Sequence, residues 1–434
     1  MKIAQIVTGL LIDAVDDEGR GRALHDGWDI AVRGALPGDV VAKALIEVVF
    51  PQRALAQARR LGPPRGPLHI DRNCGHDGPC AACPLHGVDE GFAAALKQER
   101  VRQAFVDVGL PVVVEAVVAG DGLRQKIKLV SGGQAGAIRL GHYVPHSHQL
   151  APATRCGHTR DDIIDVVDAL QQRLNDQALG PERVKAVIAR AFVEGVGVVV
   201  VGHGPAPRLS SLRVPGCSSI AWRRDEDAGN SLVGGVVVDV DGAVIGSPLD
   251  GGPRCAVDAF CQADLGGAQR LIELSADFAL GSDDDDGAGR GLFFDLYAGT
   301  GAFARALLAR GATHVVAVEV SAVSVAALTN IKGVVAVQGR VEDVMAQLRA
   351  AGVPHGIVVD PPRKGLGAAA VDVGSLRAAR LALVSCDVDA GAQDVRVLVD
   401  AGYTIHKVVP VDLFPGSSEV EMLTLLRRSP PSSG

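Results

Sequence analysis

The chain has 434 residues and a formal net charge of −7 at pH 7, from 43 lysines and arginines against 50 aspartates and glutamates. Hydrophobic residues make up 47% of it and charged residues 21%, which excludes a disordered or collagen-like chain and argues against a histone-like nucleic-acid binder. The length predicts two to four domains, and no apolar run is as long as a membrane helix, which takes roughly 18–20 residues.

The N-terminal segment MKIAQIVTGLLIDAVDDEG has one basic residue and a short apolar stretch, followed by acids and no small-residue cleavage site. We therefore expect no signal peptide and a cytoplasmic protein whose thiols stay reduced. Apolar runs alternate with Gly-rich turns over residues 1–58, a pattern typical of a small β-barrel. The arginine-rich stretch at 48–72 contains a single acid, Asp71, and fits either a phosphate-facing surface or a solvated linker.

Three of the eight cysteines cluster with the spacing Cys74-x5-Cys80-x2-Cys83. In a long chain with reduced thiols, this pattern predicts a metal site rather than a disulfide framework. The nearby His76 and His86 suit zinc, and thiolates alone suit an iron–sulfur cluster, so the residues leave both open. Three scattered cysteines are interpreted as small buried apolar residues: Cys217, Cys255 and Cys261.

Beyond the cysteines, helices are predicted over 88–109 and 268–280, and the Val-rich region 110–255 predicts mixed α+β structure. From residue 291 the chain alternates apolar strands with helical patterns, which predicts a parallel sheet with helices on both faces. The strands are GLFFDLY, THVVAVEV, VVAVQGR, HGIVVD and LALVSCD, with helical patterns at 302–310, 321–330, 341–351 and 390–401. Two last strands, YTIHKVVPVDLF and EVEMLTLLRR, are joined by the turn PGSS and must be antiparallel neighbours. The result is a Rossmann-like sheet of seven strands.

The segment after the first of these strands reads Asp295-Leu-Tyr297-Ala-Gly299-Thr-Gly301, with Glu319 ending the next strand. Glycines between a strand and a helix let the backbone approach a nucleotide closely, and an acid about 20 residues on can bind ribose hydroxyls. The pattern fits NAD as well as S-adenosylmethionine. Asp295 favours the methyl donor, because a carboxylate immediately before the loop would sit poorly beside a pyrophosphate.

Chemically active residues follow three further strands. Asp360-Pro-Pro-Arg363 lies after the fourth apolar strand, at the edge where ligands bind in such sheets. Arg363 replaces the stacking aromatic of amino-group methyltransferases and fits an oxygenated pyrimidine. Cys386 ends the next strand and is a candidate nucleophile rather than core filler. Glu419 and Glu421 share one face of the last strand, where glutamates are usually solvated, and one of them can reach the crevice.

These residues match one chemistry. A thiolate that adds to carbon 6 of uracil turns carbon 5 into a nucleophile for a sulfonium methyl group. The enolate oxygen then needs a donor such as Arg363, and a base must remove the proton from carbon 5. The sequence supplies a candidate for each role.

The motifs FDLYAGTG, VVDPPRKGL, VSCD and DLFPGSSEVE resemble the RNA uracil-C5 methyltransferase family, in particular its iron–sulfur type that acts on 23S ribosomal RNA, over nearly the full chain. The resemblance implies conversion of a uridine to 5-methyluridine with S-adenosylmethionine, through a covalent adduct of Cys386 with carbon 6. It implies that Glu421 is the base, that Asp360 lines the site, and that Gln262 touches the methyl donor. The same chemistry on a transfer RNA uridine is the alternative.

The same resemblance implies a multidomain α/β architecture. We expect a TRAM-like OB barrel over 1–58, a central α+β domain over 59–255, and a class I methyltransferase domain over 256–434 against which helix 88–109 can pack. It implies a [4Fe–4S] cluster held by four cysteines: Cys74, Cys80, Cys83 and Cys156. An RNA-contacting basic stretch is implied at LRQKIKL, where Arg124, Lys126 and Lys128 alternate and a solvated strand face is the alternative. RNA is the expected partner of a monomer that binds no membrane.

Four positions depart from the family pattern. Asp387 and Val388 replace an Asn-Pro pair, Glu419 replaces a histidine, and Asp264 replaces an asparagine. The nucleophile and the base are intact. The rival classes are an NAD-dependent oxidoreductase, a non-catalytic RNA-binding or ribosome-assembly protein, and a cytosine-5 RNA methyltransferase, whose cysteine would stand at Arg363.

Overall fold

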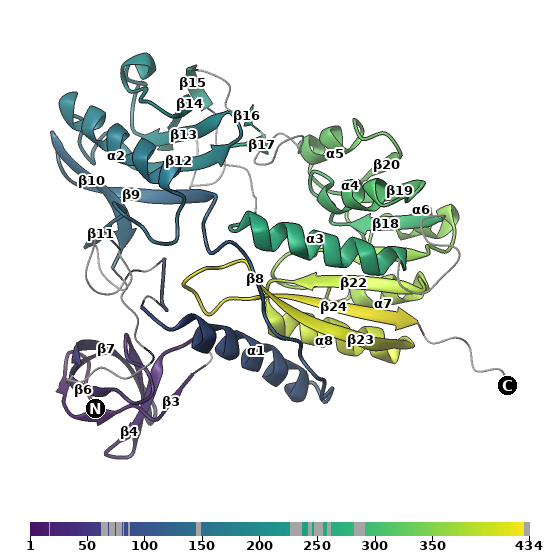
Figure 1. The fold of residues 1–434 in the computed structure, drawn as a ribbon, viewed down its shortest axis with the longest axis horizontal. Coiled ribbons are helices and arrows are strands. Elements are labelled where there is room, and N and C mark those ends of the chain that lie inside the picture. Colours follow the sequence, from purple (N-terminus) through teal and green to yellow (C-terminus); the bar gives the residue numbers. More distant parts are fainter. Residues whose placement is uncertain are drawn as a thin grey trace. The chain divides into compact units, whose positions relative to one another are not determined.

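The computed structural model groups the chain into two compact units, which the sequence enters more than once. The first unit comprises Met1–Ala93, Gly122–Leu265 and Phe414–Ser418, and the second comprises Ala94–Asp121, Gly266–Leu413 and Glu419–Gly434. The structure describes residues 1–16, 18–61, 68, 74, 80, 82–85, 87–144, 149–225, 237–241, 245–246, 255–257, 262–281 and 291–428. Each unit is treated by itself below (Figure 1).

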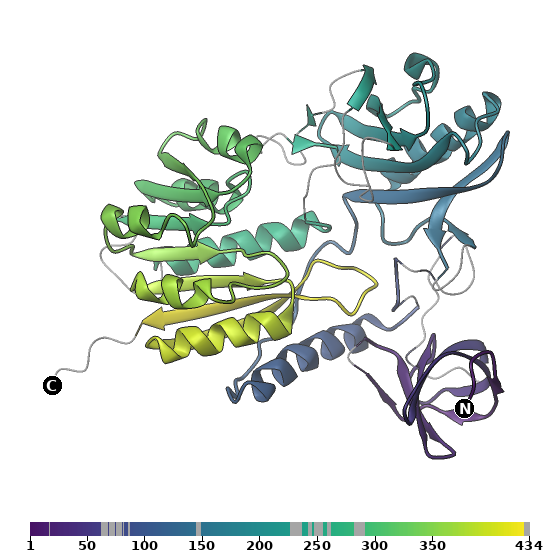
Figure 2. The same cartoon turned by 180° about the vertical axis from the view of Figure 1, so that it is seen from behind.

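The first sheet of unit one is built from short strands of the N-terminal region. Their bounds are β1 Ile6–Val7, β2 Leu10–Leu11, β3 Ala14–Val15, β4 Gly21–His25, β5 Trp28–Arg33, β6 Val40–Phe50 and β7 Arg53–Leu61. They pair in the order β1-β6-β7-β5-β4-β3, with β2 also on β6. The sheet curls around a small apolar core that includes Ile30, Val32 and Ile46, and Trp28 packs against it partly buried (Figure 2).

The second sheet of unit one belongs to the central region. It has the order β11-β10-β9-β12-β13-β14-β15. The strands are β9 Lys126–Gln134, β10 Ala137–Tyr143, β11 Leu150–Pro152, β12 Val184–Phe192, β13 Gly195–Gly202, β14 Cys217–Arg224 and β15 Val237–Asp241. Helix α2 (Asp161–Asp176) packs its apolar stripe on one face of this sheet, against residues such as Leu129 and Leu140. A short helix η1 (Leu209–Ser211) and the pair β16 (Ile245–Gly246) and β17 (Cys255–Ala256) complete the region.

Unit two is built on a sheet of eight strands in the order β20-β19-β18-β21-β22-β24-β23-β8. The strands are β8 Val118–Ala119, β18 Leu292–Leu296, β19 His314–Glu319, β20 Val334–Gln338, β21 Gly356–Val359, β22 Arg380–Ser385, β23 Tyr403–Asp412 and β24 Glu421–Arg428. β18 to β22 are parallel, and β24 runs antiparallel to both β22 and β23.

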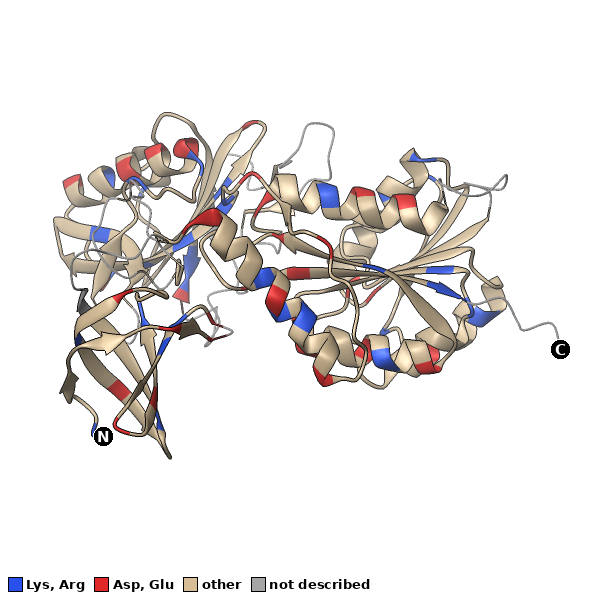
Figure 3. Cartoon of the chain, turned by 60° about the horizontal axis from the view of Figure 1, so that its bottom comes forward, with Lys and Arg blue, Asp and Glu red and all other residues tan. Residues whose placement is uncertain are grey.

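Helices cover both faces of this sheet, which Figure 3 views nearly edge on. Their bounds are α1 Glu90–Asp107, α3 Leu265–Leu280, α4 Ala302–Ala309, α5 Ala322–Leu328, α6 Met345–Ala351, α7 Ala369–Ser375 and α8 Val388–Asp400. The main core joins α1, α6, α7 and α8 to one face through alternate strand residues such as Phe294, Val316 and Leu383. None of the helices in the described ranges is long and apolar enough to cross a membrane.

The parallel sheet and its final antiparallel hairpin confirm the prediction made from the strand–helix rhythm. Two elements are absent from that prediction. β8 is only two residues long and has no periodicity of its own, and it becomes a strand because it pairs with Val411 and Asp412 of β23. α7 lies in a Gly- and Ala-rich segment, where a short helix resembles a loop in sequence.

Candidate active site

The candidate catalytic residues come together because of the direction of four strands. β21 and β22 are parallel, so Asp360 and Cys386, which follow them, emerge at the same edge of the sheet. β24 is antiparallel to β22, with Ser385 opposite Met422. The first residue of β24, Glu421, therefore begins at the edge where β22 ends, next to Cys386.

Glu421 is buried in this edge, with a side chain that is 1% exposed. Burial raises the pKa of its carboxyl to about 8, the charge of Asp360 adds to the rise, Arg363 opposes it, and Glu419 adds further. The alternative of a solvated glutamate is therefore wrong for Glu421. A buried carboxyl poised near neutral pH is what proton transfer requires.

Cys386 lies half-buried between the end of β22 and the start of α8. Burial raises the pKa of its thiol, and the negative charge of Glu421 adds to this rise, whereas the charge of Arg363 and a hydrogen bond from it lower the pKa. The thiol also stands at the N-terminus of α8, where the helix dipole favours a thiolate.

The first departure from the family pattern has a structural explanation. Asp387 is the N-cap of α8, and its side chain accepts a hydrogen bond from the Ala390 amide at 3.0 Å. Asparagine and aspartate cap helices equally well, and Val388 takes the first helical position, where proline is favoured. The exchange of Asn-Pro for Asp-Val therefore preserves the start of the helix that follows the candidate nucleophile.

Arg363 connects Cys386 with the second departure. Its Nη2 lies 3.0 Å from Oε2 of Glu419, with both side chains well exposed. Asp360, three residues earlier, has a carboxyl whose pKa burial raises to about 6. Arg363 is thus a solvent-facing cation held by Glu419 beside the Cys386 thiol.

The glycine loop between β18 and α4 has an open side and a packed side. Gly301 is the N-cap of α4 at φ +87°, and a Cβ there would lie 2.7 Å from Leu328 and Ile331. Gly299, at φ +53°, has nothing within 4 Å of such a Cβ. The backbone at Gly299 is therefore open to a ligand, while Gly301 is required by packing.

Acidic side chains hold this loop from below. Glu319 accepts hydrogen bonds from the Gly299 amide at 2.9 Å and the Ser321 amide at 2.8 Å. Asp295 is fully buried, and burial, followed by the charges of Asp360 and Glu319 against a hydrogen bond from the Ala304 amide, raises the pKa of its carboxyl to about 7. Tyr297 has a positive φ of +62°, and burial raises the pKa of its hydroxyl to about 12.

One oxygen of Asp295 is left without a partner. Oδ2 accepts from the Ala304 amide at 2.8 Å, whereas Oδ1 is buried with no hydrogen-bond partner in the described part of the chain. An unsatisfied buried carboxylate oxygen is costly. The site therefore fits a ligand that brings a hydrogen-bond donor to this loop.

Gln262 belongs to unit one, whereas the glycine loop belongs to unit two. Its neighbours Phe260 and Cys261 lie outside the described residues. Asp264, which replaces the family's asparagine, is fully buried and accepts from the Leu123 amide at 3.2 Å. An acceptor is all that this hydrogen bond needs, so aspartate serves as well as asparagine.

The four clustered cysteines lie in unit one. Cys80 and Cys83 are buried and form a β-bridge, and the pKa of the Cys80 thiol is raised by a hydrogen bond with Cys83, by burial and by the charges of Cys83 and Cys156. Cys74 approaches from the other side, 3.7 Å from the position of a Cβ on Gly157. The described residues nevertheless contain no group of three or more side chains arranged to hold a metal ion, and His76 and His86 are outside them.

Donors surround these sulfur atoms. Arg124 Nη2 donates to Cys83 Sγ at 3.2 Å, to the Ala82 carbonyl at 2.5 Å and to the Pro415 carbonyl at 2.8 Å. The Thr159 hydroxyl donates to Cys156 Sγ at 3.3 Å. Such donors suit thiolates that carry negative charge. β9 begins only at Lys126, so Arg124 is not part of the basic strand face, and the prediction of three residues on one face is correct for Lys126 and Lys128 alone.

Two further findings concern residues that the sequence left undecided or overlooked. Cys217 is a buried small residue as predicted, but Cys255 accepts a hydrogen bond from Arg190 Nη1 at 2.8 Å. Lys97 of α1 is buried, with Nζ 2.6 Å from Asp412 Oδ1 at the end of β23. A lysine on a helix is normally solvated, so only the contact with Asp412 reveals this buried pair.

No family model matches the chain. An uncharacterised RNA methyltransferase of Halalkalibacterium halodurans is 25% identical to it, over 97% of this chain and 96% of the relative. The 23S rRNA (uracil(1939)-C(5))-methyltransferase of Halomonas elongata is 26% identical, over 96% of this chain and 89% of the relative. This chain is a relative of the RNA methyltransferases.

A solved structure shares the fold over almost the whole length. The tRNA (uracil-54, C5)-methyltransferase of Pyrococcus abyssi, in complex with S-adenosyl-L-homocysteine, is similar with a TM-score of 0.73, covering 97% of this chain and 100% of that one. The two sequences are 19% identical. The relationship to RNA methyltransferases thus extends across both units.

Proposed function

We propose that this chain methylates carbon 5 of a specific uridine in 23S ribosomal RNA, with S-adenosylmethionine as donor and Cys386 as covalent nucleophile. The single observation that carries the proposal is the meeting of Cys386, Glu421 and Asp360 at one edge of the unit-two sheet. A thiol beside a buried carboxyl of raised pKa matches a reaction that needs a nucleophile and then a base. The relatives' names support methylation of uracil in RNA.

In the proposed reaction the Cys386 thiolate forms a bond to carbon 6 of the uracil, and the ring electrons move to carbon 5 and its carbonyl oxygen. Arg363 stabilises that oxygen as a hydrogen-bond donor. S-adenosylmethionine supplies the electrophilic methyl group that carbon 5 takes. Glu421 then removes the proton from carbon 5, the carbon–sulfur bond breaks, and Cys386 leaves as a thiolate.

The methyl donor fits the residues at the glycine loop. Gly299 and Gly301 let the backbone approach it, Tyr297 lines the loop, and Asp295 offers a buried oxygen that requires a donor. Glu319 already holds the loop backbone, and its remaining lone pairs can accept ribose hydroxyls. Gln262 is proposed as a further contact. An NAD-dependent oxidoreductase would share the loop but would leave the Cys386 and Glu421 pair without a role.

We further propose that Cys74, Cys80, Cys83 and Cys156 hold a [4Fe–4S] cluster. Two buried thiols, a nearby third and fourth, and the donors Arg124 and Thr159 support this assignment over core packing. The cluster would supply a rigid cross-link between segments far apart in sequence. The three-domain division at 1–58, 59–255 and 256–434, with a TRAM-like barrel first, is part of the proposal, as are a cytoplasmic location and a monomeric state.

A transfer RNA uridine is the second candidate target, because the solved neighbour acts on transfer RNA. One experiment separates the two. The protein is purified without air and incubated with labelled S-adenosylmethionine and unmodified 23S or transfer RNA transcripts, with Cys386→Ala in parallel. We expect 5-methyluridine in 23S RNA, identified by nuclease digestion and mass spectrometry, and none with the variant. Label only in transfer RNA would move the target, and no label in either RNA despite bound donor would contradict the proposal.

A further inference from the structure

A hollow lies on the central sheet of unit one, away from any residue used above for the methylation chemistry. One part has a volume of about 340 Å³ and is lined by Lys126, Lys128, His142 and Phe414, among others. An adjoining part of about 260 Å³ shares Lys128 and His142 and adds Tyr143. Together they have the size of an ordinary small-ligand site.

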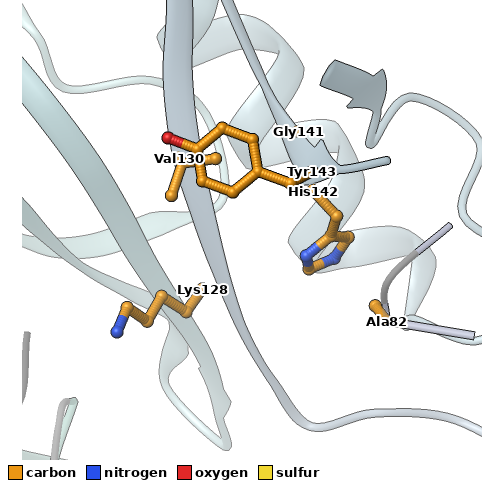
Figure 4. A pocket seen from close by; sticks show the side chains of 6 residues that line it. All are labelled: Ala82, Lys128, Val130, Gly141, His142 and Tyr143. Carbon is orange, nitrogen blue, oxygen red and sulfur yellow. The ribbon is translucent and has the colours of Figure 1, made fainter. Parts of the chain in front are cut away.

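The sheet register explains which side chains face the hollow. Ile127 and Leu129 of β9 pack in the core under α2, so Lys126 and Lys128 point to the opposite face. Val130 is the register partner of Gly141, which puts Tyr143, two residues along β10, on the same face as Lys128. Tyr143 is 41% exposed. Figure 4 shows its ring beside Val130, with Lys128 and His142 extending from the two strands around the opening.

The charges at the hollow are positive. Burial lowers the pKa of Lys128, and the charges of Arg223 and Lys185 lower it further, so this ammonium lies among cations. The nearby Asp225 is engaged by Lys185, at 2.8 and 2.9 Å. Neither part of the hollow has an Asp or Glu among its described lining residues. A cation kept in such surroundings favours an anionic ligand.

The combination of rings and ammonium groups narrows the ligand class. A phosphate alone would use the lysines and leave the exposed Tyr143 ring and the apolar wall unexplained. A nucleotide uses both, because its base stacks on an aromatic ring and its phosphate binds the ammonium groups. In a double helix the bases are stacked on one another, so the fit is to an unpaired nucleotide.

We propose that this hollow binds one unpaired nucleotide of the RNA substrate, with the base against Tyr143 and its phosphate at Lys126 and Lys128. This second RNA site rests on the proposed function only in that RNA is the substrate. It lies in the unit that does not contain Cys386. Binding energy gained on a neighbouring nucleotide offsets the cost of taking the target uridine out of its stack.

The stacking half of the proposal is tested with Tyr143→Ala and Tyr143→Phe. The probe is a fluorescein-labelled single-stranded RNA of mixed sequence, and the readout is its Kd by fluorescence anisotropy. We expect Tyr143→Ala to weaken binding roughly 5- to 150-fold, the range for loss of one base–aromatic stack. Tyr143→Phe keeps the ring and should bind like the wild-type protein. Equal binding by wild type and Tyr143→Ala would overturn the proposal.

The phosphate half is tested by salt dependence. Lys128→Gln removes one phosphate contact, so the slope of log affinity against log salt should fall by about 0.7 for single-stranded RNA. Arg173→Gln is the matched control, because Arg173 is an exposed cation on α2, on the other face of the same sheet. Equal slopes for the two variants would contradict a phosphate at Lys128.

Wild-type protein provides a test that does not depend on the folding of any variant. RNA carrying 4-thiouridine is photo-crosslinked, and the peptide that retains the label is identified by mass spectrometry. Crosslinks within 137–143 are expected, and crosslinks confined to other peptides would overturn the site. The proposed function fails separately: RNA binding that depends on Tyr143 without any 5-methyluridine formed would support the site and reject the reaction, whereas methylation with unaffected RNA binding by the variants would do the reverse.

Discussion

At the scale of single residues, Cys386 and Glu421 divide the reaction between them, and the division can be made visible. Replacing Glu421 with Gln removes the base but leaves the thiol, so addition and methyl transfer proceed while release is blocked. We expect a covalent RNA–protein adduct that survives denaturing electrophoresis, and turnover slowed about 100-fold or more. Glu419→Gln is the matched control, because it makes the same chemical change at an exposed residue. An adduct in the control but not in Glu421→Gln would reverse the two roles.

The same two residues set the pH dependence. Glu421 has a pKa raised to about 8, and the pKa of Cys386 is also raised, so both are mainly protonated below neutral pH. The reaction uses both in their charged forms, and kcat/KM should therefore rise with pH through about 8. The charge of Asp360 is the second cause that raises the Glu421 pKa, so Asp360→Asn should move the inflection to lower pH. Rates measured across this range check the direction, and an upward shift would contradict the assignment.

At the scale of elements, α8 fixes where the thiol stands. Asp387→Ala removes the side-chain cap of α8, and we expect the free energy of unfolding to fall by about 1 kcal/mol. Asp387→Asn keeps an equivalent acceptor and restores the family's residue, so it should be close to wild type. Urea denaturation followed by circular dichroism measures both. If Asn is as destabilising as Ala, the hydrogen bond to the Ala390 amide is not what the position requires.

The elements also show how far a sequence pattern reaches. The apolar strands from residue 291 onward were predictable because parallel strands buried on both faces leave continuous hydrophobic runs, and Asp360 and Cys386 follow from where those runs end. β8 was not, because a two-residue strand exists only through its pairing with β23. Lys97 reads as a solvated helix residue, and only the approach of Asp412 turns it into half of a buried ion pair.

At the scale of the whole molecule, the cysteines belong to one compact unit and the glycine loop to the other. Cys80→Ser should therefore remove iron and sulfide and lower the melting temperature, and leave S-adenosylmethionine affinity within a few-fold of wild type. Elemental analysis, thermal unfolding and calorimetric titration measure the three effects on protein purified without air. Zinc in place of iron would overturn the cluster assignment, because Cys/His sites of this kind also suit zinc. Undiminished iron in the variant would exclude Cys80 as a ligand.

The sequence by itself determined the chemistry that this protein carries: a strand–loop–helix with Gly299 and Gly301, an Asp-Pro-Pro-Arg turn, and a thiol at a strand end. These signals are local, because each is a residue type at a fixed distance from an apolar run. The tertiary structure decided the environment of each group. Glu421 became a buried acid rather than a solvated one, and Arg124 became a partner of Cys83 rather than part of a basic strand face. Burial and charge at these positions come from segments hundreds of residues apart in the chain, and no local pattern records which of them will meet.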